Sequence, residues 1–305
     1  MKVAKQQKIA GQQKIAGQQK IAGQQKTAGQ QLDASCLVKG TRVALRIEYD
    51  GSAFHGWQAQ PHLQCATVQE TLEQALSQVG NKPIRTHCAG RTDTGVHGYG
   101  QIVHFDDAAG RSPKAWVMGT NSLLPSSVRV HWAVPVVPDF HARFSAYARR
   151  YRYVIANTAI RPAHLDGKVS CFRRPLDVER MTDAAQALIG EHDFSAFRAA
   201  HCQANSPKRE ILQLSVSRWG DFVIVDIMAN AFLHHMVRNI VGSLQMIGAG
   251  LRPVGWLQEL LLGRDRAAAA DTASGAGLYL VAVYYPERFE LPPIPEGPAF
   301  LSGKI

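Results

Sequence analysis

The stretch ILQLSVSRWGDFVIVDIMA, residues 211–229, decides the fold class of this chain. Both of its halves are rich in the β-branched and apolar residues that favour strands. Trp219-Gly220 lies between them, and glycine enters turn conformations without steric cost. The pattern therefore predicts a β-hairpin, with Asp226 inside its second strand in a structural role.

Helical patterns flank this predicted hairpin on both sides. Asp177 favours a helix N-terminus, and apolar residues at helical spacing follow it as far as Gly190. Residues 233–247 again place apolar side chains on one helical face, and GLYLVAVYY at 277–285 predicts a final strand.

The first half of the chain has the same style. Thr67 with Glu70 forms a capping-box pattern, and the helix that it predicts ends at Gly80. Another helix is predicted at 116–124. Strands are predicted at residues 42–51, 84–89, 101–105 and 128–134.

These elements predict an α+β protein in which two similar halves form a mainly antiparallel sheet with helices packed on it. The chain has 305 residues, of which 46% are apolar, enough for one large or two medium cores. We expect an N-terminal α+β domain at 36–140 and a C-terminal α+β domain at 141–305.

Residues 1–35 differ from the rest in composition. The unit QQKIAG recurs with a period of six from Gln6 to Gln31 and offers too little apolar surface to order a chain. We expect a disordered tail without assigned function, with a short β-solenoid as the alternative. The tail holds six lysines and one aspartate, so it supplies half of the net charge of +10. The remaining 28 basic and 23 acidic residues indicate nucleic acid only if arginines cluster.

Several classes of protein are excluded by composition. No apolar run approaches the roughly 18 residues of a membrane-spanning helix, and the N-terminus lacks the apolar core of a secretory signal. The five cysteines are scattered without a CxxC pair, which argues against disulfides and a structural zinc site. We expect a cytoplasmic protein with free thiols.

The loop AGRTDTGVH at residues 89–97 is the first candidate for chemistry, because its glycines and short polar residues predict a tight turn that presents Arg91 and Asp93. Glycoside hydrolysis needs two carboxylates, whereas this loop has one. A lone aspartate beside an arginine is suited to act as a nucleophile or to stabilise a cation. The alternative is that Asp93 caps its own turn and only pairs with Arg91.

A second candidate is the arginine and tyrosine cluster within residues 141–153. On a strand, alternate residues project from opposite faces, so one face could hold an RNA base while cations hold the backbone. The alternative is an edge strand with solvated charges. Arg149, Tyr151 and Tyr153 would share one face, and the candidate RNA-binding arginines are Arg143, Arg149, Arg150 and Arg152.

The predicted helix at 233–247 carries a third candidate, with His234, His235, Arg238 and Asn239 opposite its apolar stripe. Adjacent residues on a helix point about 100° apart, so we expect the two histidines not to share a metal ion. Arg238 is expected to meet a carboxylate or a phosphate.

Four ordered motifs carry a resemblance to a known family. The chain resembles the bacterial tRNA pseudouridine synthase A family over residues 41–301, and the family's fold implies the α+β architecture predicted above. The motifs are GRTDTGVHGYGQ at 90–101, FHARFSAYARRYRY at 140–153, FLHHMVRNIVG at 232–242 and GLYLV at 277–281.

The resemblance implies isomerisation of uridine to pseudouridine at tRNA positions 38, 39 and 40, in the anticodon stem-loop, after the base is flipped out. It implies that Asp93 is catalytic, that Arg91 helps to displace the base and that Tyr151 stacks on the uracil. It further implies that Arg238 pairs with the aspartate and that Leu278 closes the apolar side of the pocket.

The resemblance also implies a homodimer that binds one tRNA with both subunits and needs neither cofactor nor metal. Thr94 departs from the alanine common in the family. Attack of Asp93 on C6, its attack on C1′ and its removal of a ribose proton all stay open. The rival functions are a non-catalytic RNA-binding module, which would not need Asp93, and a phosphate-handling metalloenzyme, which would need clustered ligands.

Overall fold

The computed structural model describes residues 33–60, 65–200 and 202–301. Contacts divide the chain into residues 1–33 and a body at 34–305, and the following concerns the body. The predicted repeat tail lies outside the described residues, apart from its last three positions.

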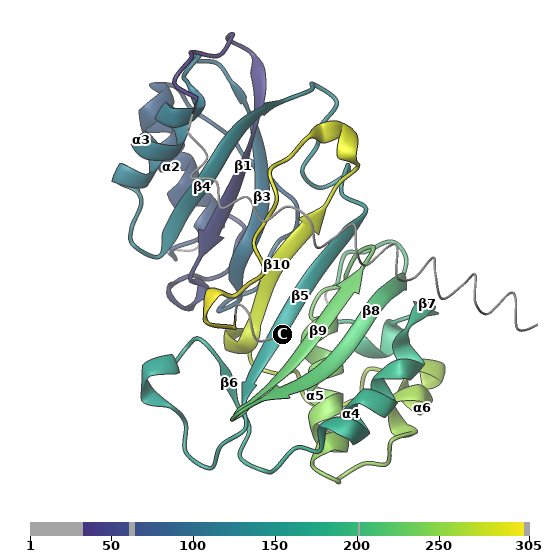
Figure 1. The fold of residues 1–305 in the computed structure, drawn as a ribbon. Helices are drawn as coiled ribbons and strands as arrows, with labels where there is room; N and C mark the ends of the chain where they lie inside the picture. The colour runs from purple at the N-terminus through teal and green to yellow at the C-terminus, as the bar shows by residue number, and fades with distance from the viewer. Residues whose placement is uncertain (1–32, 61–64, 201, 302–305) are drawn as a thin grey trace, which may run out of the picture. The chain divides into compact units, whose positions relative to one another are not determined.

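The described strands form one mainly antiparallel sheet in the order β4-β1-β3-β10-β5-β9-β8-β7, which confirms the predicted fold class (Figure 1). β2 pairs with β3, and β6 with β5. Only the β3–β10 and β5–β6 pairs among them are parallel. The strands are β1 (Thr41–Tyr49), β2 (His87–Cys88), β3 (His97–Asp107), β4 (Val128–Val136), β5 (Ala148–Ala156), β6 (Ser170–Cys171), β7 (Gly190–Asp193), β8 (Lys208–Trp219), β9 (Phe222–Ala229) and β10 (Leu278–Tyr284).

The helices gather at the two ends of this sheet (Figure 1). Beside β4 and β1 lie α2 (Val68–Gly80) and α3 (Pro113–Leu123), where Trp116 packs edge-to-face on Phe105 of β3. Beside β8 and β9 lie α4 (Val178–Ala185), α5 (Met236–Gly248) and α6 (Trp256–Gly263). None of the helices in the described ranges is long and apolar enough to cross a membrane.

The predicted hairpin is confirmed as β8 and β9, which pair from Ile211 with Ala229 to Trp219 with Phe222. Its turn lies at Gly220-Asp221, one residue later than predicted. Gly220 has a φ of 54°, which glycine adopts without the steric cost that a Cβ would add.

The predicted N-caps of two helices are confirmed. Thr67 accepts a hydrogen bond from the amide of Glu70, and Asp177 accepts one from the amide of Arg180. The predicted end of α2 at Gly80 is also confirmed, although Asn81 takes the left-handed conformation that caps it. The second helix ends earlier than predicted, because α4 stops at Ala185 and continues as a 3₁₀ turn.

The predicted helix at 233–247 begins later than its apolar pattern suggested. α5 starts at Met236, and His235 before it has a left-handed φ of 62°. Asn239 was predicted on an exposed polar face, but it is fully buried and donates to the carbonyl of Phe197. The apolar spacing extends back to Leu233 because the side chain of Leu233 also packs in the core. The backbone of Leu233 itself is not helical.

β10 lies between β3 and β5, so a strand from near the end of the chain joins elements of both predicted halves. Leu278 and Leu280 of β10 pack in the core with Tyr151 and Tyr153 of β5. The boundary between 36–140 and 141–305 stays a prediction.

Candidate active site

The loop with Asp93 connects β2 to β3 and is held by the loop that follows β1. The amide of Trp57 donates to the carbonyl of Thr92 at 2.9 Å, and that of Gly95 donates to Phe54 at 3.4 Å. The hydroxyls of Thr92 and Tyr49 are hydrogen-bonded at 2.8 Å. These contacts fix the backbone on both sides of Asp93.

Two glycines from other segments let their backbones approach this loop closely. Gly56 has a φ of 88°, and a Cβ added to it would lie 2.7 Å from the carbonyl oxygen of Thr92. A Cβ on Gly275 would lie 2.5 Å from the carbonyl oxygen of Thr94. Both distances exclude a side chain, so the loop is clamped between two backbones.

The carboxylate of Asp93 is one-quarter exposed and faces three side chains from the segment at the start of α5. Arg238 donates from Nη1 to Oδ2 at 3.0 Å. Nε2 of His234 lies 3.3 Å from Oδ1, and Nε2 of His235 lies 3.4 Å from Oδ2. Folding thus brings together motifs about 140 residues apart.

Arg238 is held in place from its other side. Its Nε donates to the carbonyl of Ala273 at 2.8 Å, and the amide of Ala273 donates back to the carbonyl of Arg238 at 3.2 Å. One guanidinium therefore links the Asp93 loop to the segment that leads into β10. Planar donors in a fixed geometry make arginine suited to this bridge.

The sequence predicts that the two histidines lie on the helix at 233–247, but in the structure they do not. Both precede α5, and their imidazole centroids are 4.0 Å apart. Their reactive nitrogens and the Asp93 carboxylate all lie within 4.8 Å of one another. Burial, together with the charge of Arg238, lowers the pKa of His235 despite the opposing effect of Asp93.

Tyr151 provides an aromatic surface beside the loop. A Cβ built on Gly90 would lie 3.6 Å from its hydroxyl oxygen, and its ring packs edge-to-face on Phe232 with centroids 5.0 Å apart. Burial raises the pKa of its hydroxyl, and the charge of Asp93 raises it further. Leu278 is buried in the same core and pairs with Tyr153, next to Tyr151 along β5.

The predicted RNA-binding arginines fall into two groups. Arg143 is exposed, as is Arg91 of the Asp93 loop. Arg149 instead donates to main-chain carbonyls, among them those of Asn230 at 3.0 Å and Ala89 at 3.2 Å. It thereby ties β5 to the first residue of the loop.

Arg150 and Arg152 hold Asp226 across the sheet. Arg150 binds both carboxylate oxygens, at 2.7 and 2.9 Å, and Arg152 binds Oδ2 at 2.7 Å. Arg152 is 2% exposed and also donates to the carbonyl of Gly297. The structure corrects the prediction that Arg152 contacts RNA, because its guanidinium is enclosed in the protein, whereas the structural role predicted for Asp226 is confirmed.

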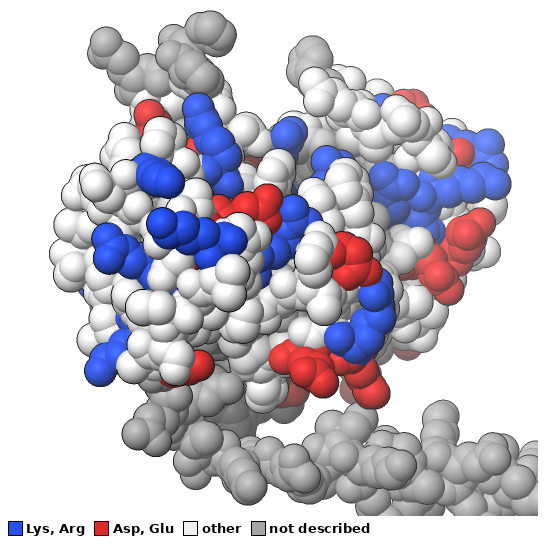
Figure 2. All heavy atoms as spheres, turned by 90° about the horizontal axis from the view of Figure 1, so that it is seen from above, with Lys and Arg blue, Asp and Glu red and all other residues white. Residues whose placement is uncertain are grey.

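Basic side chains lie in several separate groups over the face seen in Figure 2, among uncharged residues and smaller groups of acidic ones. This distribution agrees with the modest basic excess of the chain outside its tail. Such a surface provides phosphate contacts without sequence specificity.

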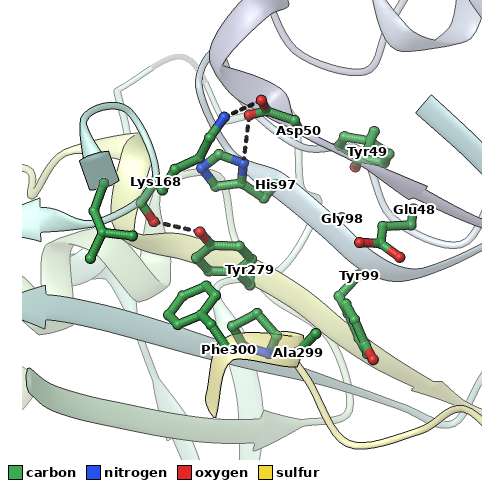
Figure 3. A pocket seen from close by; sticks show the side chains of 12 residues that line it. Glu48, Tyr49, Asp50, His97, Gly98, Tyr99, Lys168, Tyr279, Ala299 and Phe300 are labelled. Carbon is green, nitrogen blue, oxygen red and sulfur yellow. Dashed lines mark hydrogen bonds and ion pairs between the residues drawn. The ribbon is translucent and has the colours of Figure 1, made fainter. Parts of the chain in front are cut away.

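A pocket of about 220 Å³ contains His97, which the sequence analysis overlooked as a functional residue (Figure 3). His97 accepts from the amide of Gly51 at Nδ1, 3.0 Å away, and its Nε2 bonds the carbonyl of Ala276 at 3.1 Å. A carbonyl only accepts, so Nε2 carries a proton, and Nδ1 also lies 3.3 Å from Oδ1 of Asp50. Tyr279 stacks on the ring with centroids 4.5 Å apart.

His97 follows the Asp93 loop directly and is 2% exposed. Its two hydrogen bonds connect η1 (Gly51–Ala53) with η5 (Gly275–Gly277), the turn that precedes Leu278. Asp50, which precedes η1, accepts from the amide of Ser52 and also binds Lys168. The only sequence signal for His97 was its place at the end of the quoted loop motif.

Comparison with known proteins shows the family to which this chain belongs. The sequence profile described as tRNA pseudouridine synthase matches residues 46–145 and 184–286, and the chain belongs to this family. It is therefore an isomerase that converts uridine to pseudouridine in tRNA. Asp93, Arg238 and Leu278 lie inside the matched ranges, whereas Tyr151 lies between them.

Individual relatives agree with this assignment. The chain is 58% identical over 261 residues to a protein named tRNA pseudouridine synthase A from Enterobacter sp. (strain 638), covering 86% of this chain and 96% of that protein. It is 56% identical, with the same coverage, to the protein of that name from Klebsiella pneumoniae (strain 342). The resemblance found in the sequence motifs is confirmed.

Proposed function

We propose that this enzyme isomerises uridines 38, 39 and 40 in the anticodon stem-loop of tRNA, with Asp93 as its catalytic residue. The observation that carries the proposal is the Asp93 carboxylate itself. It is partly exposed on a clamped loop, is bound by Arg238 and lies near the ring of Tyr151.

The reaction conserves all atoms of uridine. The bond from N1 to C1′ breaks, the detached uracil turns, and a bond forms from C5 to C1′. The proton released from C5 is balanced by the proton gained at N1. A base must leave its RNA stack to react in this way, and the detached ring must be held meanwhile.

Tyr151 and Leu278 are suited to hold the ring. Tyr151 stands on a buried strand with Phe232 packed against it, so its ring is rigid enough to serve as a stacking surface. Leu278 begins the neighbouring strand and adds an apolar wall. Arg91 is exposed on the same loop as Asp93 and is placed to occupy the space that a flipped base leaves.

Asp93 acts as an ionised carboxylate in each of its candidate roles. Attack on C6, attack on C1′ and removal of a ribose proton all need a free oxygen lone pair beside the nucleoside. A carboxylate offers about four lone-pair positions, and Arg238, His234 and His235 face at most three of them, so a lone pair stays available for this chemistry. The contact orients the carboxylate and balances its charge.

We further propose that the enzyme acts in the cytoplasm as a homodimer whose two subunits share one tRNA, and that it needs neither cofactor nor metal. Exposed Arg91 and Arg143 and the basic surface of Figure 2 support an RNA partner. The relatives named tRNA pseudouridine synthase A support the choice of tRNA.

Mapping pseudouridine on tRNA tests both the activity and its position. We expect tRNA from cells without this protein to lack pseudouridine at positions 38, 39 and 40, and the purified protein to restore it on that tRNA. The Asp93→Asn protein at equal concentration should restore none. Pseudouridine restored at other positions would overturn the site assignment, and restoration by Asp93→Asn would overturn the catalytic one.

A further inference from the structure

We propose that Asp93, His234 and His235 form a binding site for a zinc-like divalent cation, and that a cation bound there inhibits the enzyme. The inhibition rests on the proposed catalytic role of Asp93. The cation site itself rests only on the geometry of the three side chains, which project from the β2–β3 loop and from the turn before α5.

The ligand atoms have the separation that a zinc ion requires. Zinc binds imidazole nitrogen and carboxylate oxygen at about 2.0–2.2 Å, so tetrahedral ligands lie roughly 3.4 Å from one another. Nε2 of His234 is 3.3 Å from Oδ1 of Asp93, and Nε2 of His235 is 3.4 Å from Oδ2. Each histidine is thus at ligand spacing from one of the two carboxylate oxygens, and a set with one ligand atom from each of the three residues lies within 4.8 Å.

The donor set also selects the kind of cation. Two imidazoles and one carboxylate are the ligands of open zinc sites, in which a fourth position stays free for water or substrate. Magnesium and calcium prefer shells made of oxygen. Zinc and its neighbours in the first transition row bind imidazole best, so they are the cations expected here.

The backbone brings the two histidines together in advance. His235 has a φ of 62°, a conformation that is uncommon for residues other than glycine. This conformation turns both imidazoles toward the same carboxylate, with ring centroids 4.0 Å apart. On a regular helix the two side chains would diverge. The strained turn is therefore what makes a shared site possible.

Arg238 limits the affinity of the site without blocking it. Its Nη1 binds Oδ2, and its Nε is fixed on the carbonyl of Ala273. Oδ1 faces His234 and can bind a cation while Oδ2 keeps its arginine. The nearby positive charge disfavours a divalent cation, so the site is expected to fill only when the cation is abundant.

Occupancy has a direct consequence for the reaction. A carboxylate that coordinates a cation presents fewer lone pairs to the nucleoside, and the cation occupies the space in front of it. The site therefore acts as a reversible block, separate from the isomerisation, for which we propose no metal.

Cobalt(II) provides a direct probe, because its visible absorption reports ligand number and type independently of activity. We expect the full-length chain to bind one Co²⁺ with a tetrahedral spectrum and to release it to Zn²⁺. Asp93→Asn, His234→Ala and His235→Gly should each weaken binding by about tenfold or more, which corresponds to about 1.4 kcal/mol per tenfold change. Glycine suits the left-handed backbone at position 235, so that variant removes the imidazole without adding strain.

Two control variants complete the binding test. His164→Ala removes an exposed imidazole elsewhere and should leave binding unchanged. Cys202→Ser should also leave it unchanged, although the Cys202 thiol accepts from the amide of His234. Absence of Co²⁺ binding, or binding that survives all three ligand variants, would overturn the proposed site.

The inhibition is measured separately on tRNA. We expect Zn²⁺ to reduce turnover and a chelator to restore it fully. The inhibitory concentration should rise at least about tenfold in His234→Ala, measured relative to that variant's own metal-free rate. Binding without inhibition would overturn the block and keep the site. An enzyme inactive even without metal would instead contradict the proposed function, while the Co²⁺ spectrum still decides on the site.

Discussion

Asp93 and Asp226 both bind arginine, and they do so in opposite ways. Asp226 lies in the middle of β9 with 3% exposure, and its oxygens accept three hydrogen bonds from Arg150 and Arg152. Asp93 lies on a loop with one-quarter of its side chain exposed, and accepts one hydrogen bond from Arg238.

The difference shows how contacts between aspartate and arginine serve two purposes. The Asp226 carboxylate is enclosed and its charge is compensated by two guanidinium groups, so it connects β5 and β9 and has little left to offer a substrate. Asp93 has its charge balanced and its position fixed, yet it keeps lone pairs and an open side. Exposure and unused hydrogen-bonding capacity therefore separate the catalytic candidate from the structural one.

The largest effect is expected from Asp93→Asn. Turnover on tRNA should fall on the order of 10³-fold or more, because an amide is neither a nucleophile nor a base. The free energy of unfolding should change by less than about 1 kcal/mol, since the side chain is partly exposed. Single-turnover kinetics and urea unfolding measure the two quantities. The exposed control Asp166→Asn should alter neither.

The opposite result is expected from Asp226→Asn. The buried guanidinium of Arg152 and the partly exposed one of Arg150 would lose the carboxylate that they share, which lowers the free energy of unfolding by roughly 3–5 kcal/mol. Turnover per folded molecule should stay close to that of the unchanged protein. Urea unfolding and rates corrected for the folded fraction provide the test. A severe loss of turnover in stably folded protein would remove the contrast between the two aspartates.

Arg238→Lys tests whether Arg238 acts on Asp93 through its charge alone or also through its geometry. The ammonium keeps the charge but cannot bind both Asp93 and the carbonyl of Ala273 with one planar group. We expect kcat to fall by about 10–100-fold with KM nearly unchanged, because orientation is lost while charge is kept. Arg252→Lys, which changes a guanidinium stacked on Trp256, is the matched control. An unchanged kcat would show that charge alone suffices.

A smaller effect is expected from His97→Ala, which removes the side chain that joins Gly51 to Ala276 beside the Asp93 loop. Without the bridge between Gly51 and Ala276, the positions of Asp93 and Leu278 become less well fixed. We expect kcat to fall about tenfold with KM unchanged, and His97→Gln to recover part of the rate through its amide. If both variants lose the same amount of stability and their rate per folded molecule does not change, His97 acts in folding alone.

Much of the fold was predictable from local patterns. The hairpin at 211–229 and the helices after Thr67 and Asp177 were found because alternation, apolar spacing and capping residues act over short distances. The start of α5 was misplaced because Leu233 is buried without being helical. An apolar residue at helical spacing shows that a side chain is buried, but it does not show whether that residue is itself part of the helix.

The candidate site was predictable only in part. Motifs pointed to Asp93, Tyr151 and Arg238, but no local pattern indicated that both histidines before α5 turn toward the same carboxylate. Arg152 was expected to bind RNA because it belongs to an arginine and tyrosine cluster on a predicted strand, whereas tertiary packing encloses it with Asp226.

The sequence by itself determined the family, most of the strands and helices and the aspartate that we propose as catalytic, because motifs and periodicity depend on residues that are neighbours in the chain. Only the tertiary structure decided which arginines are enclosed, where the helix after His235 begins and which groups meet at Asp93. Those outcomes depend on contacts between segments more than 100 residues apart, and such contacts leave no local pattern in the chain.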